Sequence, residues 1–178
     1  MQKNLKEFVK IKNDLKVVLK NKAVFDVVLF GSFVKGKENP GDIDVAIICS
    51  EKLDLDFSEE YHVSWINLND FFVKSISLGN TLLREGFSLR HNKYFSEVFG
   101  FQSKLLFVYD FSNLENSKKV KFVNILRGLS EKKGVVEIHG GEWVARQVFL
   151  TPVSEEVFFD DLFSKNKIKY KKSFNLIH

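Results

Sequence analysis

Two short apolar segments joined by a polar turn constrain the fold of this chain more than any other feature. Residues 25–30 and 43–48 are rich in β-branched and aromatic side chains, and each has the length of one buried strand. Gly31 and Ser32 end the first segment, and Gly36 lies in the connection that follows. We therefore expect strands over residues 25–30 and 42–48, joined by a tight turn and a flexible loop.

Asp42 and Asp44 open the second of these strands. Side chains at positions i and i+2 of a strand point the same way, so both carboxylates are expected on one face. Two clustered carboxylates repel each other unless a cation lies between them, and hard oxygen ligands favour Mg²⁺. We interpret Asp42 and Asp44 as candidate catalytic residues and metal ligands, with two ions possible. The alternative is a pair of solvated carboxylates before a strand.

The Gly31-Ser32 turn has the composition of a phosphate site. Gly31 lets the backbone approach a phosphate, and the Ser32 hydroxyl adds a donor. A turn that enters a short helix also offers free backbone N–H groups. Alone, the dipeptide is an ordinary turn; its combination with the two carboxylates indicates nucleotide binding. Lys35 and Lys37 could hold a triphosphate as point charges or simply belong to a solvated loop.

The rest of the chain alternates helical and extended patterns. We expect a helix over residues 2–19, a short helix starting at Asn69 or Asp70 as its cap, and another helical segment that closes at residues 82–86. Two further helices are expected over residues 117–129 and over 154–163, the second with Ser154 as cap. Further strands are expected over residues 61–68, 105–109, 143–150 and 168–171. This order predicts a mixed α/β (α+β) chain. A boundary near Gly100 divides it into residues 1–100 and 101–178.

The net charge of +4 comes from 27 Lys and Arg against 23 Asp and Glu, and only four of the basic residues are Arg. Such a balance is compatible with RNA or an acidic protein as partner but requires neither. The basic runs at residues 118–121 and 165–172 could follow a phosphate backbone, with Tyr170 stacking on a base. The alternative is a polar helix start and a charged edge strand.

Localisation is constrained by what the sequence lacks. One cysteine, Cys49, cannot form an internal disulfide, which fits a reducing compartment. The charged N-terminus has no apolar core of signal-peptide length, and no apolar run approaches the ~20 residues of a membrane helix. We expect a cytoplasmic protein without a membrane partner.

The spacing from Gly31-Ser32 to Asp42-Ile43-Asp44, followed by an apolar strand, resembles the signature of the polymerase-β-type nucleotidyltransferases. The resemblance continues more weakly to Glu85-Gly86-Phe87-Ser88-Leu89, covers about residues 1–100, and is closest in size to the minimal nucleotidyltransferases. It implies a mixed-sheet core with flanking helices, a nucleotide held by Gly31 and Ser32, and Mg²⁺ held by Asp42 and Asp44. Residues 101–178 match no family and form an α/β extension of unknown role.

The third strand departs from this pattern. The family places a third carboxylate there, as metal ligand and base, whereas this sequence aligns Ser64 with that position. Losing a positioned base typically costs 10²–10⁴-fold in rate. Glu60, Asp70 and His62 are candidate substitutes, although a strand histidine is more often structural.

The resemblance implies a Mg²⁺-dependent enzyme that moves a nucleoside monophosphate from a nucleoside triphosphate, with ATP as the default donor. The acceptor would be a hydroxyl of RNA, a small molecule or a protein, since small members include antitoxins that modify a partner toxin. The alternative is a catalytically degenerate module that binds nucleotide or RNA and acts through a partner.

Overall fold

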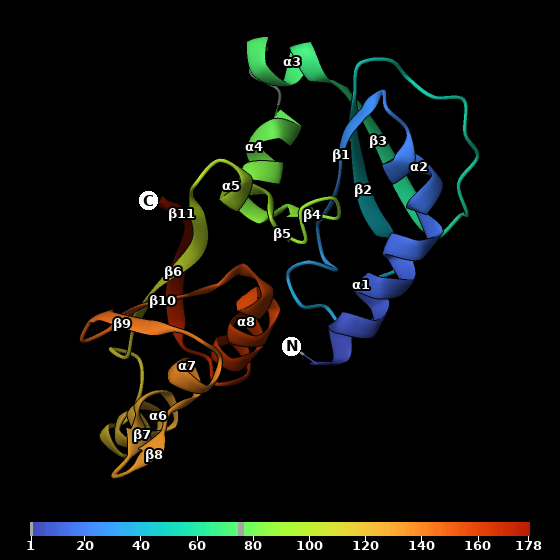
Figure 1. Ribbon diagram of the computed structural model, residues 1–178. Coiled ribbons are helices and arrows are strands. Elements are labelled where there is room, and N and C mark those ends of the chain that lie inside the picture. The colour runs from blue at the N-terminus through green and yellow to red at the C-terminus, as the bar shows by residue number, and fades with distance from the viewer. Residues whose placement is uncertain (1, 75–76) are drawn as a thin grey trace. The chain divides into compact units, whose positions relative to one another are not determined.

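The computed structural model describes residues 2–74 and 77–178 (Figure 1). The chain divides into two compact units, the first made of Met1–Val34 with Glu38–Gly100 and the second of Lys35–Lys37 with Phe101–His178. Each unit has its own sheet and its own helices, which confirms the mixed α/β (α+β) class. None of the described helices has the length and apolar character needed to cross a membrane.

The first unit is built on a five-stranded sheet of order β3-β2-β1-β4-β5. Its elements in chain order are α1 (Gln2–Asp14), α2 (Lys16–Lys20), β1 (Val24–Phe30), β2 (Ile43–Cys49), β3 (Tyr61–Asn67), α3 (Leu68–Val73), α4 (Ser77–Glu85), β4 (Phe87–Ser88), β5 (Lys93–Tyr94) and α5 (Phe95–Val98). β2 pairs antiparallel with β1 and parallel with β3. The three long strands confirm the expected strands over residues 25–30, 42–48 and 61–68.

Both faces of this sheet are covered by apolar side chains. Val27 and Val45 point into a core that includes the buried Leu15. Val28 and Ala46, one residue further along each strand, point into a second core shared with α4 and α5. A strand buried on both sides reads as an uninterrupted apolar run, which is why these strands stand out in the sequence.

The first helices and their caps differ in detail from expectation. The helix expected over residues 2–19 is two helices, α1 and α2, separated at Leu15, whose side chain still packs in the core. α3 is capped by Asn67, which accepts a hydrogen bond from the Asn69 N–H at 2.9 Å. The expectation of Asn69 or Asp70 as cap was therefore wrong, because the strand ends directly in the helix without a linker.

The second unit is built on a four-stranded antiparallel sheet of order β11-β6-β10-β9. Its elements in chain order are β6 (Gln102–Asp110), α6 (Asn116–Arg127), β7 (Gly128–Leu129), β8 (Lys132–Lys133), α7 (Val135–Ile138), β9 (Glu142–Ala145), β10 (Val148–Pro152), the 3-10 turn η1 (Val153–Glu155), α8 (Glu156–Lys165) and β11 (Lys169–Ile177). Alternate residues of β6 and β10 are buried, so one face of the sheet carries the core.

Two expectations for the second unit were wrong. The single strand expected over residues 143–150 is a hairpin, in which β9 turns back on β10 and Trp143 lies opposite Phe149. Ser154 does not cap α8, because the preceding residues form a 3-10 turn and the helix begins at Glu156. β11 also extends to Ile177, well beyond the expected strand over residues 168–171.

Candidate functional site

The turn after β1 brings the backbone against a carboxylate. Phe30, the last residue of β1, lies opposite Asp44 in the antiparallel pair. Gly31 follows with a φ of 74°, in the left-handed region that glycine adopts without strain. A Cβ atom at this position would lie 2.2 Å from Oδ2 of Asp44. Only glycine therefore allows the turn and the carboxylate to approach this closely.

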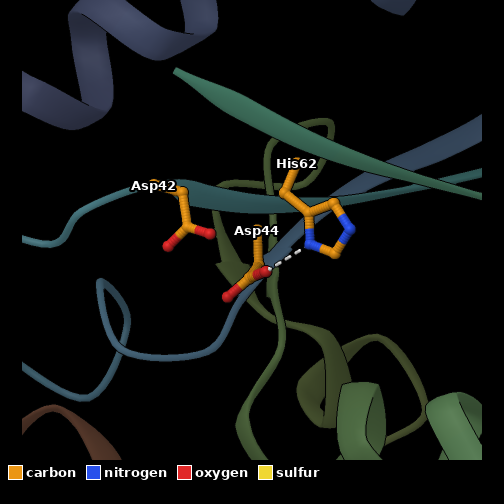
Figure 2. A group of neighbouring side chains, drawn as sticks. All are labelled: Asp42, Asp44 and His62. Carbon is orange, nitrogen blue, oxygen red and sulfur yellow. Dashed lines mark hydrogen bonds and ion pairs between the residues drawn. The ribbon is translucent and has the colours of Figure 1, made fainter. Parts of the chain in front are cut away.

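Asp42, Asp44 and His62 come together at one end of the sheet (Figure 2). Asp44 lies beside His62 in the parallel β2–β3 pair, and Nδ1 of the imidazole is 3.1 Å from Oδ1 of Asp44. Asp42 precedes β2, and one ligand atom from each of the three residues lies within 4.8 Å of the others. This spacing is suitable for side chains that share one cation.

The cluster is acidic and open to solvent on one side. The side chain of Asp44 is 24% exposed and that of His62 is 67% exposed. Within residues 2–74 and 77–178, neither Asp42 nor Asp44 forms an ion pair with Lys or Arg. Clustered carboxylates attract cations, so Asp42 and Asp44 could hold a divalent ion.

Glu85 supports the turn from the other side. Its carboxylate is buried and accepts a hydrogen bond from the Gly31 N–H at 3.2 Å. Gly86 allows α4 to pack closely on β1, since a Cβ there would lie 2.5 Å from the Leu82 carbonyl oxygen and 2.7 Å from a Val28 methyl group. The Gly31 amide is thus engaged within the protein, and a phosphate at this turn would have to be bound by Ser32 instead.

Residues 31–36 form consecutive turns, and the expected short helix is not formed there. Phe33 and Val34 are buried in the core and fix the turn, while Ser32 is half-buried. The Ser32 hydroxyl makes no hydrogen bond with the described part of the chain. The Ser32 hydroxyl is therefore available to a ligand. Because no helix begins at this turn, there are no free helix N-terminal amides to bind one.

Among the candidates for a third residue beside Asp42 and Asp44, the structure places only His62 next to Asp44. Ser64 lies beside Ala46, two residue pairs further along the strands than the Asp44–His62 pair. Glu60 pairs with Lys10 at 3.4 Å, and Asp70 pairs with Lys74 at 2.8 Å. His62 is the residue that faces Asp44, and sequence reasoning had placed Ser64 in that position.

The remaining basic candidates lie in the second unit. Lys35 and Lys37 group with that unit, where the Lys35 carbonyl accepts a hydrogen bond from the Val157 N–H. Tyr170 donates to Asp160 at 2.8 Å and packs its ring against Phe163. These contacts favour the structural interpretation of the run at residues 165–172 over base stacking.

Lys172 from the same run is also engaged. Its ammonium group pairs with both Glu156 and Asp160 of α8. Burial by itself lowers the pKa of a lysine, but the two carboxylates outweigh that effect and raise the pKa of Lys172. Lys172 therefore fastens β11 to α8.

Fold and site together define a mixed α/β protein with a carboxylate–imidazole cluster beside a glycine turn. The chain belongs to a family of unknown function (DUF6932), whose sequence profile matches residues 2–174. No curated protein and no solved structure matches the chain. Because the matched range spans both compact units, the second unit is part of the family's common sequence.

Proposed function

We propose that the protein is a metal-dependent nucleotidyltransferase. It moves a nucleoside monophosphate from a nucleoside triphosphate to a hydroxyl group of RNA, a protein or a small molecule. One observation carries the proposal: Asp42 and Asp44 converge with metal-ligand spacing, and Oδ2 of Asp44 lies directly against the Gly31 turn. A phosphate held at the turn would therefore lie beside a bound cation.

The residues present fit a divalent cation. Two carboxylates and an imidazole would supply oxygen and nitrogen ligands, and solvent and phosphate oxygens would supply the others. When bound, the cation neutralises negative charge on the phosphates and on the departing pyrophosphate. Asp42 and Asp44 hold it, and the Ser32 hydroxyl donates to a phosphate oxygen.

The reaction is an in-line displacement at the α-phosphorus. The acceptor oxygen forms a bond to that phosphorus while the bond to the oxygen bridging the α- and β-phosphates breaks. Pyrophosphate leaves with the electrons of the broken bond, and the hydroxyl proton passes to water. The chain contributes position and charge, because phosphoryl transfer needs little covalent chemistry from the protein.

The test is transfer of an α-labelled nucleotide. The purified chain is incubated with each α-³²P nucleoside triphosphate and a divalent cation, with and without cellular RNA or a protein extract. We expect label in an acceptor, reduced at least about 10²-fold by Asp44→Asn, because a lost metal ligand removes several kcal/mol of charge stabilisation. Asp70→Asn is the matched control, since that carboxylate pairs with Lys74 outside the cluster.

A second candidate is a binding module without turnover. It is favoured by the cluster itself, which has an imidazole where a third carboxylate would act as base. Nucleotide binding without transfer of label in any mixture would support this candidate. Partner binding would then survive Asp44→Asn nearly unchanged, whereas an enzyme would lose its activity.

A further inference from the structure

The third ligand position of the cluster holds nitrogen instead of oxygen. His62 lies beside Asp44 in register, and its Nδ1 approaches Oδ1 of Asp44 at 3.1 Å (Figure 2). The second oxygen, Oδ2, lies against the Gly31 turn, where an added Cβ would be 2.2 Å away. The carboxylate is thus held between the turn and the imidazole, which sets its orientation before any ion binds.

The chemistry of this ligand set discriminates between cations. Mg²⁺ prefers an octahedral shell of oxygen atoms and keeps several waters, while imidazole suits transition-metal ions such as Zn²⁺, Fe²⁺ and Ni²⁺. Mn²⁺ opens that series and also takes carboxylate ligands. Such ions lie about 2.1 Å from each ligand, so neighbouring ligands on one side of an octahedral ion are about 3 Å apart. The three ligand atoms lie within 4.8 Å of one another, and side-chain rotation would bring them together around one ion.

We infer that Asp42, Asp44 and His62 hold a transition-metal ion such as Mn²⁺ in preference to Mg²⁺, with Nδ1 of His62 as the third ligand. Coordination through Nδ1 puts the ring proton on Nε2, the nitrogen that faces away from Asp44 (Figure 2). The inference rests on the proposed function, because the nucleotidyltransferase would use the ion. Binding of the ion itself is measured without nucleotide.

The experiment titrates the full chain with Mn²⁺ and with Mg²⁺ by calorimetry, and records electron spin echo modulation of the Mn²⁺ complex. We expect tighter binding of Mn²⁺ than of Mg²⁺ and a ¹⁴N coupling from the imidazole. His62→Ala should abolish the coupling and weaken Mn²⁺ at least about tenfold, since losing even a residue that supports a ligand costs 10–100-fold in affinity. His62→Asp should narrow or reverse the preference for Mn²⁺ over Mg²⁺.

His91→Ala is the matched control, because His91 is an exposed histidine of the same unit outside the cluster. It should retain both the coupling and the affinity. Asp44→Asn should lose Mn²⁺ binding, which locates the ion. The inference is overturned if Mn²⁺ does not bind, if His62→Ala keeps the ¹⁴N coupling, or if Mg²⁺ binds as tightly as Mn²⁺.

These outcomes separate the inference from the proposed function. Mn²⁺ bound through His62 without transfer of label to any acceptor would contradict the nucleotidyltransferase and leave the metal site standing. Label transfer with Mg²⁺ that is equal in wild type and His62→Ala would support the nucleotidyltransferase and contradict the use of a metal ion bound through His62.

Discussion

The two compact units of this chain differ in where they place charge. The first unit contains 12 Lys and Arg and 14 Asp and Glu, whereas the second unit contains 15 basic and 9 acidic residues. The first unit, with a net charge of −2, gathers Asp42, Asp44 and His62 into one cluster. The second unit has a net charge of +6, yet Lys172 and Lys104 are engaged in ion pairs. Local arrangement, and not net charge, marks the candidate site.

The two sheets also differ in where their apolar side chains lie. In the first unit apolar side chains cover both faces of the sheet, and the acidic cluster lies at one end of the strands. In the second unit the buried side chains alternate along β6 and β10, and aromatic rings fill the core on one face. In the first unit, a site can therefore form at the ends of the strands, whereas in the second unit one face of the sheet remains half-exposed.

The largest expected effect tests whether the two cores are independent. Phe163 is fully buried among the aromatic rings of the second unit, so Phe163→Ala should destabilise that unit by about 3–5 kcal/mol. Each unit holds one tryptophan, Trp65 in the first and Trp143 in the second. Urea unfolding of Trp65→Phe and Trp143→Phe backgrounds follows each unit separately by fluorescence.

We expect Phe163→Ala to shift the Trp143 transition and to leave that of Trp65 in place. Leu82→Ala, at a fully buried position of the first unit, should show the opposite pattern. Equal shifts of both transitions would mean that the units unfold as one, and the comparison would then fail.

The next effect concerns the turn beside the carboxylates. Gly31→Ala should destabilise the first unit by about 1–3 kcal/mol through its positive φ alone, with a further cost from the clash with Asp44. It should also abolish Mn²⁺ binding. Gly100→Ala is the control, because Gly100 has a φ of 84° and open space around it. Equal losses in the two variants would show that the approach of Asp44 to the turn does not matter.

A smaller effect tests whether cations of the second unit are structural. The Arg127 guanidinium lies 3.7 Å from the centre of the Trp143 ring and donates to the carbonyl oxygens of Ala145 and Arg146. Arg127→Ala should therefore cost about 1 kcal/mol in unfolding followed through Trp143. Arg127→Lys keeps the charge but not the paired donors, and should recover only part of this loss. Unchanged stability with weaker RNA binding would instead assign Arg127 to a partner surface.

The last effect is a pH dependence of the first unit. Burial raises the pKa of Asp26, although hydrogen bonds from Ser88 and the Val27 N–H oppose it. The folded state then takes up a proton more readily than the unfolded state, so the penalty of the buried charge appears above the ordinary pKa of 3.8 as pH rises. The stability of wild type relative to Asp26→Asn should fall from pH 4 to pH 7. A flat difference in Trp65-monitored unfolding would show that burial does not disfavour the charged form.

The first unit was predictable where structure is local. The strands around Val27 and Val45 were expected because both of their faces are apolar. Asp42 and Asp44 were expected to lie together because residues two apart in a strand share a face. The turn between β9 and β10 was missed because Arg146 and Gln147 are not turn-forming residues. A hairpin without Gly, Asn or Asp reads as one strand.

His62 could not be singled out from Glu60 and Asp70 in the sequence, because its place beside Asp44 depends on pairing between distant segments. The β2–β3 register is set by matching apolar residues, with Val45 beside Val63 and Ile47 beside Trp65. Aligning these pairs would have placed His62 beside Asp44, but a sequence read one strand at a time gives no register. The contact of Glu85 with Gly31 likewise joins residues 54 positions apart.

The exposure of His62 has a consequence for how such a site can change over time. Substitutions at exposed positions usually alter stability by no more than about 0.5 kcal/mol, and the His62 side chain is 67% exposed. Asp44, wedged against the turn, has no such freedom. If His62 is a metal ligand as we propose, a lineage could exchange the residue at position 62 and adapt to the metals of its surroundings, while the strands and the turn stay under selection for folding.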